Sequence, residues 1–288
     1  MLEGTSSFKE ESIALVNKII QRIYNWKFLT ILSMEINTFV KSKKFIAFFV
    51  IFLFPVLVMS FPPLENASKI SLSSFLRFFE ENTSDEILSY WAGIPAQVIA
   101  AMVASEMIAR ELDKETIKLL FTKPLRKAEI VIGKFLAFVM ILLLVLIPVL
   151  ITYSTVFVLT YEKGYEELLA ILSSSFWWGL GVILLSLCFV GSLAIAMSTI
   201  LKRSLYAALA TILLIIAVQL LIVTLPFLKN ADTYTFAYQL GVILEEVYYL
   251  GGSNIYKGDP YLSFTFFMVS IIASLIVAEV TLVRKEVP

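Results

Sequence analysis

Long apolar runs constrain this chain more than any other feature of its sequence. A membrane-spanning helix needs about 20 mostly apolar residues, because each residue adds about 1.5 Å along the axis. Six stretches meet that requirement: Phe45–Pro63, Tyr90–Ser105, Phe135–Tyr161, Leu168–Leu201, Ser204–Leu228 and Tyr261–Ala278. Charged residues make up 16% of the 288 residues, against about 25% in a soluble domain. The sequence therefore predicts an all-α integral membrane protein with six transmembrane helices.

Several classes of enzyme are excluded by missing residue types. The chain has no histidine, which rules out Ser-His-Asp triads and HExxH zinc sites. The interiors of the six stretches contain no Asp, Glu, Lys or Arg, so an intramembrane enzyme would lack acid–base groups. The single cysteine, Cys188, cannot form an intrachain disulfide. We expect no catalytic residue, no metal site, no cofactor and no nucleic-acid partner for this chain.

The basic residues indicate how the chain is oriented in the membrane. If the six stretches span the bilayer, one side carries eighteen basic and eleven acidic residues, and the other carries five and twelve. The side that is rich in Lys and Arg is cytoplasmic by the positive-inside rule. Both termini are then cytoplasmic, and the protein is a multi-pass protein of the cell membrane. Two N-x-S/T sequons, at Asn66 and Asn82, fall in the first outer loop.

The chain divides into an N-terminal segment, 1–44, a six-span domain, 45–283, and a short cytoplasmic tail, 284–288. Apolar residues fall on one half of a helix over 13–26, which predicts an amphipathic helix in the membrane interface. Its apolar half includes Val16, Ile20, Ile23 and Trp26. Such a helix places its basic residues toward the headgroups, and it can be no more than a plain anchor.

The loop 106–134, between the second and third spans, projects into the cytoplasm in this topology. The second helix is expected to continue through Glu106 into the charged residues beyond it. Helix-forming residues dominate up to Phe121, and Pro124 breaks the helix and suits the first turn of a new one. Leu120 and Leu125 are apolar in a segment that is otherwise exposed to water. They either cover the helix ends of this protein or dock in a groove of a partner.

Two amides, Gln97 and Gln219, lie inside predicted spans. Each either lines a transport pathway or makes a hydrogen bond between helices, and the second role is the commoner one. Small residues recur in the fourth and fifth spans and favour close helix packing, within one chain or between two chains.

The loop and its lead-in resemble a known family. The pattern comprises Glu106, Arg110, Glu111, Thr116, Leu119, Leu120, Lys123, Pro124, Leu125, Arg126, Glu129, Ile130, Gly133 and Lys134. It is similar to the first cytoplasmic loop of ABC-2-type ABC transporter permeases. The segment from Met34-Glu35 to Phe45 resembles the elbow region that precedes the first span of that family. By motif the resemblance covers residues 28–140.

The resemblance implies a membrane subunit of an ATP-driven transporter, with an exporter as the family tendency. Such permeases pair into a twelve-span unit, and their second and fifth spans line the pathway. It implies that ten residues couple the spans to the ATPase: Glu106, Arg110, Glu111, Thr116, Leu120, Lys123, Pro124, Leu125, Arg126 and Glu129. It assigns five residues to the elbow: Val16, Ile20, Ile23, Trp26 and Glu35. The segment 229–260 is expected to fold into outer helices, one of them over Thr233–Leu250.

The ATPase of such a machine would be a separate protein. The chain has no GxxxxGK[ST] motif and no room for a nucleotide-binding domain. ATP and Mg²⁺ would therefore be held by a cytoplasmic ABC ATPase, and this chain would not itself be an enzyme. Its other partners would be the lipid bilayer and a second permease, identical or related. The alternative is a membrane scaffold or assembly factor that transports nothing, and the sequence does not reveal a substrate.

Overall fold

The structure is a computed structural model, and it describes residues 27–59, 93–113, 127–160, 166, 175–201, 203–224, 231–248 and 258–284. Within these ranges it consists of eight α-helices and one 3-10 helix, with no strand. The elements are α2 (Lys27–Val40), α3 (Lys43–Met59), α6 (Ile94–Asp113), α8 (Lys127–Thr160), α10 (Ser175–Ile200), α11 (Ser204–Thr224), η3 (Ala231–Tyr234), α12 (Phe236–Tyr248) and α13 (Pro260–Arg284). The prediction of an all-α protein is confirmed for the described part of the chain.

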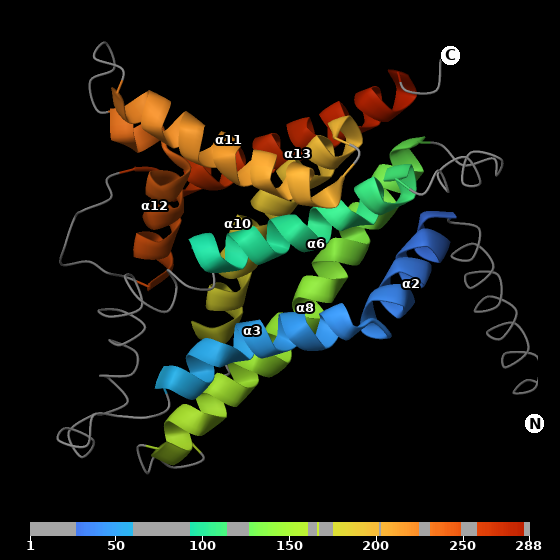
Figure 1. Cartoon of the computed structure of the whole chain (residues 1–288). Coiled ribbons are helices and arrows are strands. Elements are labelled where there is room, and N and C mark those ends of the chain that lie inside the picture. The colour runs from blue at the N-terminus through green and yellow to red at the C-terminus, as the bar shows by residue number, and fades with distance from the viewer. Residues whose placement is uncertain are drawn as a thin grey trace, which may run out of the picture.

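Helix α10 lies at the centre of the helix assembly. It packs against α6, α13, α11 and α8. In the most apolar stretch of α10, 72% of the residues are buried, whereas the corresponding share is 22% for α11 and 28% for α13. Helix α2 lies along the first turns of α8, and α12 lies at the opposite end of the molecule (Figure 1). The largely exposed apolar surfaces of α11 and α13 suit contact with lipid or with other helices.

Four of the described helices are long and apolar enough to cross a bilayer: Lys127–Val156, Phe176–Ile200, Ser204–Ile222 and Pro260–Arg284. They correspond to the third to sixth predicted spans. The first two predicted spans coincide with α3, which has 17 residues, and α6, which has 20 residues and a charged last turn. The chain is therefore a multi-pass membrane protein, and the total of six spans stays a prediction.

Small side chains allow α6 and α10 to approach closely. The buried face of α6 includes Ala96, Ala100 and Ala104, all fully buried, and α10 is the helix with which α6 makes most of its contacts. On α10, Gly191 faces the ring of Phe138 from α8. The small residues predicted in the fourth span are thus used for packing within one chain.

An aromatic cluster holds α12 against the bundle. Phe236 of α12 stacks on Phe189 of α10 at 4.8 Å between ring centroids, and it meets Phe267 of α13 edge-on at 5.3 Å. Leu240 and Ile243 of the same helix are also buried. This helix is the one predicted within Thr233–Leu250, and its apolar face explains the amphipathic pattern of the sequence.

Candidate functional site

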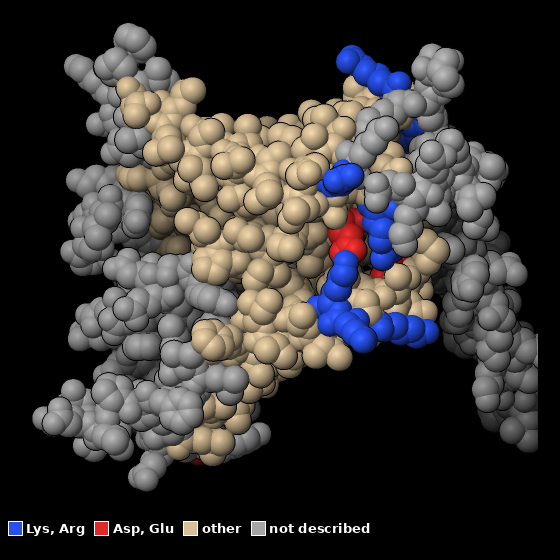
Figure 2. Space-filling view, in the orientation of Figure 1, with Lys and Arg blue, Asp and Glu red and all other residues tan. Residues whose placement is uncertain are grey.

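Charged side chains gather at one end of the molecule, where α2, α3 and α11 begin and where α6 and α13 end. Figure 2 shows the blue and red side chains together at this end and a mostly tan surface over the rest of the described residues on the visible face. The basic side chains that the structure describes are those of Lys41, Lys43, Lys44, Arg110, Lys127, Lys134, Arg203 and Arg284. All of them belong to the side that the sequence assigns to the cytoplasm.

The structure brings some of the predicted site residues to this end. Glu106, Arg110 and Glu111 lie on the last turns of α6, Glu129 lies in the first turn of α8, and Glu35 lies on α2. The remaining coupling residues fall outside the described residues: Thr116, Leu120, Lys123, Pro124, Leu125 and Arg126. The same holds for the elbow residues Val16, Ile20, Ile23 and Trp26 and for the sequons at Asn66 and Asn82.

A buried lysine forms the centre of the charged end. The side chain of Lys134 on α8 is 1% exposed, and its Nζ lies 2.6 Å from Oε1 of Glu35 and 2.8 Å from Oε1 of Glu111. The same Nζ donates to the carbonyl oxygen of Met107 at 2.6 Å. These contacts use all three donors of an ammonium group. We call Lys134, Glu35 and Glu111 the ion triad; it joins α2, α6 and α8.

Helical spacing places the members of the ion triad on buried faces. Ile31 and Glu35 are four residues apart and both buried, so they lie on the same face of α2. Met107 and Glu111 have the same spacing on α6 and are also buried. The carboxylates are therefore carried into the interior by the same helix faces that pack the bundle.

The ion triad holds one cation and two carboxyl groups. Burial raises the pKa of Glu111, while the nearby charge of Lys134 acts in the opposite direction. The negative charge of Glu35 adds to the rise, and Arg110 opposes it. The surroundings of Glu111 thus disfavour its ionised form.

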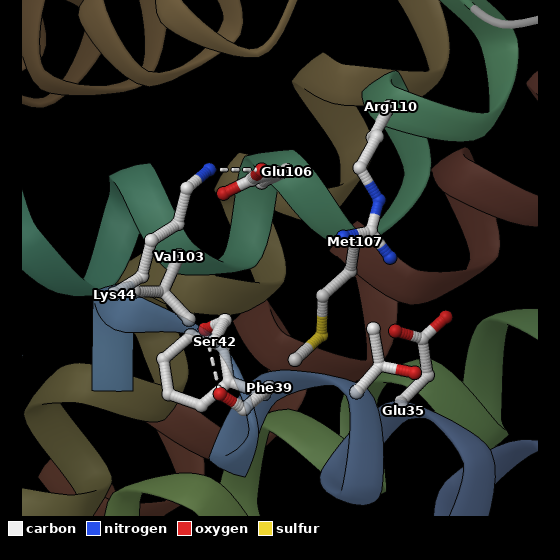
Figure 3. Close-up of a pocket in the computed structure, with 9 residues that line it drawn as sticks. Glu35, Phe39, Ser42, Lys44, Val103, Glu106, Met107 and Arg110 are labelled. Carbon is white, nitrogen blue, oxygen red and sulfur yellow. Dashed lines mark hydrogen bonds and ion pairs between the residues drawn. The ribbon is translucent and has the colours of Figure 1, made fainter. Parts of the chain in front are cut away.

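A second ion pair lies closer to solvent. Lys44 at the start of α3 contacts Glu106 of α6, with side chains 62% and 24% exposed. A small cavity of about 70 Å³ lies between this pair and the ion triad. Figure 3 shows Glu35, Arg110 and Met107 around it, with the Arg110 guanidinium and the Glu35 carboxylate directed into the same space. The described residues contain no group of three His, Cys, Asp or Glu that could hold a metal ion.

We expect Glu111→Gln to remove part of the pH dependence of stability. A carboxyl group whose pKa is raised in the folded protein stabilises the fold below its unfolded pKa, here 4.5. That stability is lost as the pH rises through the raised folded value, by up to about 1.4 kcal/mol per pH unit. The variant should therefore gain stability over the wild type as the pH rises from 5 to 8, measured by thermal unfolding in detergent. Glu246→Gln, at an exposed position of α12, is the control, and parallel curves for Glu111→Gln and the wild type would contradict the prediction.

The two amides inside the spans occupy different surroundings. Gln97 is buried on α6, and its Nε2 lies 3.4 Å from Oγ of Ser186 on α10. Gln219 is half-buried on α11, between the exposed residues Val218 and Leu220. Gln97 therefore makes a hydrogen bond between helices.

Lys134 and Ser186 are not among the site residues that the sequence predicts. Lys134 belongs to the loop pattern only as one of its basic residues, and Ser186 belongs to no predicted pattern. The signal for Lys134 is its position directly before the apolar run that starts at Phe135. No local pattern distinguishes Ser186 from the other serines of the fourth span.

Comparison with known proteins identifies one family. A family model described as "ABC-2 family transporter protein" matches residues 29–281, which include every described helix except the first residues of α2 and the last residues of α13. A search of curated proteins finds no match.

Proposed function

The chain belongs to the ABC-2 transporter family, and on this premise we propose that it is the membrane subunit of an ATP-driven exporter. Its motor is a separate cytoplasmic ABC ATPase, which holds ATP and Mg²⁺. The charged end of the molecule faces the cytoplasm, with both termini on that side.

The observation that carries this proposal is the ion triad. Residues 114–126, the centre of the predicted coupling loop, connect α6 to α8. Lys134 ties the helix that follows this segment to Glu111 at the end of the helix that precedes it, and also to Glu35 on α2. Lys134 and Glu111 link the start of α8 to the end of α6, the two helix ends that flank residues 114–126. A displacement of residues 114–126 would therefore move α2, α6 and α8 together as one unit.

The proposed cycle is alternating access. Closure of the ATPase around ATP displaces the loop through Thr116, Leu120 and the Lys123–Arg126 segment, and the bundle then rocks against a second permease copy or a related permease. Glu106, Arg110, Glu111 and Glu129 transmit the movement at the helix ends. Gln219, on the fifth span, is the remaining candidate for the pathway between the two copies, since Gln97 is buried and bonded to Ser186 within one chain.

Co-purification tests the proposal. We expect this chain, isolated from its native membranes in a mild detergent, to carry a protein with a GxxxxGK[ST] motif and ATPase activity. Replacement of Leu120 and Leu125 by Asp should lower the recovery of that protein at least about tenfold, since apolar side chains in a partner's groove contribute most of such binding energy. Mass spectrometry of the purified complex gives the ratio of the two chains.

Val283→Asp is the control, because it puts an aspartate on an exposed position at the same end of the molecule. It should leave the ratio unchanged. A scaffold that transports nothing would give no ATPase partner, or a partner that is retained equally by the Leu120/Leu125 variant. Either result would contradict the proposed function.

A further inference from the structure

The ion triad contains one more carboxyl group than it contains cations. Nζ of Lys134 contacts Oε1 of Glu35 and Oε1 of Glu111, so the two carboxyl groups are close neighbours. Their side chains are only 6% and 11% exposed. With both groups ionised, the triad would bury a net negative charge, which costs far more free energy than burying a neutral cluster. A single proton held by the two carboxyl groups removes this charge, as it does at other sites where two carboxyl groups lie together.

Arg110 offers a second way to neutralise the triad. Its guanidinium lies on the same side of the cavity as the Glu35 carboxylate, and both are directed into that space (Figure 3). The charges of Lys134 and Arg110 favour the ionised form of Glu111, whereas the charge of Glu35 disfavours it. Helices α10 and α11 carry no Asp, Glu, Lys or Arg. The other charged side chains that the structure describes at this end are the pair Lys44 and Glu106, and Lys41, Lys43, Lys127, Glu129, Arg203, Glu279 and Arg284.

The cavity connects the triad to a more exposed part of the surface. Its volume is about 70 Å³, which is room for about two water molecules. Glu35 and Arg110 line it on the side of the triad, and the ion pair of Lys44 and Glu106 lines it on the side that is closer to solvent. Water in this cavity would therefore reach the Glu35 carboxylate without any opening of the helix packing.

We propose that the ion triad is a proton-binding site, in which Glu35 and Glu111 share one proton and Arg110 replaces its charge when it leaves. In the protonated form Glu111 is neutral and Lys134 pairs with the Glu35 carboxylate. On deprotonation Glu111 becomes a carboxylate, the proton passes by way of Glu35 to water in the cavity, and the Arg110 guanidinium moves toward Glu35.

The proton is bound at low pH and released as the pH rises. Burial raises the pKa of Glu111 above its ordinary value of 4.5, so the protonated form persists at a pH at which exposed glutamates are ionised. The proton site itself needs no ATPase. Only its effect on the movement of α2, α6 and α8 rests on the proposed function.

Infrared spectroscopy of the purified chain tests the site, because a protonated carboxyl group has a carbonyl stretching band that a carboxylate lacks. Between pH 6 and pH 9 exposed carboxyl groups are ionised, and we expect the wild type to lose the band of one buried carboxyl group. Glu35→Gln and Glu111→Gln should each abolish this band, since one carboxylate on one ammonium group needs no proton. Arg110→Gln should raise the midpoint of the titration by about one pH unit, a usual effect of removing a nearby opposite charge. Arg110→Lys should restore the midpoint of the wild type.

Glu246→Gln is the control, because it removes an exposed carboxyl group of α12 and should change neither the band nor its midpoint. The absence of a titrating band in the wild type, or a band that persists in both Glu35→Gln and Glu111→Gln, would overturn the proton site. An unchanged midpoint in Arg110→Gln would overturn the part assigned to Arg110. Because the chain is measured alone, these outcomes are separate from those of the co-purification experiment, and a missing ATPase partner would leave the proton site intact.

Discussion

Replacing Lys134 with methionine is expected to destabilise the protein by about 3–5 kcal/mol, the usual cost of removing one partner from a buried ion pair. The substitution keeps most of the side-chain volume but leaves Glu35 and Glu111 without their shared cation. Both carboxyl groups are buried, and the carbonyl oxygen of Met107 loses the same donor. Unfolding by a denaturing detergent, followed by circular dichroism, measures the loss.

The neutralised triad provides the rescue experiment. Lys134→Met combined with Glu35→Gln and Glu111→Gln should recover most of the lost stability, because no unpaired charge stays buried. Lys41→Met, at an exposed position, should change stability by less than about 0.5 kcal/mol. If Lys134→Met unfolds like Lys41→Met, the ion triad does not hold the three helices together, and the proposed transmission through it fails as well.

The sequence predicts helices of this protein well because helix formation is local. The apolar runs predict α8, α10, α11 and α13. The second helix is expected to run through Glu106, and α6 does so, since it ends at Asp113. The amphipathic pattern within Thr233–Leu250 likewise predicted α12. Each of these predictions uses residues that are neighbours in the chain.

The neighbours of each helix could not be predicted in the same way. In a bilayer, lipid and protein interior are both apolar, so hydropathy does not tell which helix faces which. Glu35 and Lys134 are separated by 99 positions and Gln97 and Ser186 by 89. The loop pattern contained Glu111 and Lys134, and the elbow pattern contained Glu35, but only the packed structure brings the three together.

Gly191→Val is expected to destabilise the protein by about 3 kcal/mol, the upper end of the usual cost of overpacking a core. A Cβ atom at this position of α10 would stand 2.6 Å from Cζ of Phe138 on α8, much closer than carbon atoms pack. Phe138 is fully buried, so its ring has no free space into which it can move. The two methyl groups of valine would therefore push α8 and α10 apart at the centre of the bundle.

Gly181→Val on the same helix is the matched control, because a Cβ atom there meets no atom of another helix within 4 Å. Both substitutions replace glycine in α10 with the same residue, so the difference between them isolates the contact with Phe138. Denaturing-detergent titrations should show the control within about 0.5 kcal/mol of the wild type. Phe138→Leu should restore part of the stability of Gly191→Val, since the two positions share one space and their effects are not additive. Equal stability of the two valine variants would show that α8 and α10 do not approach each other at Gly191.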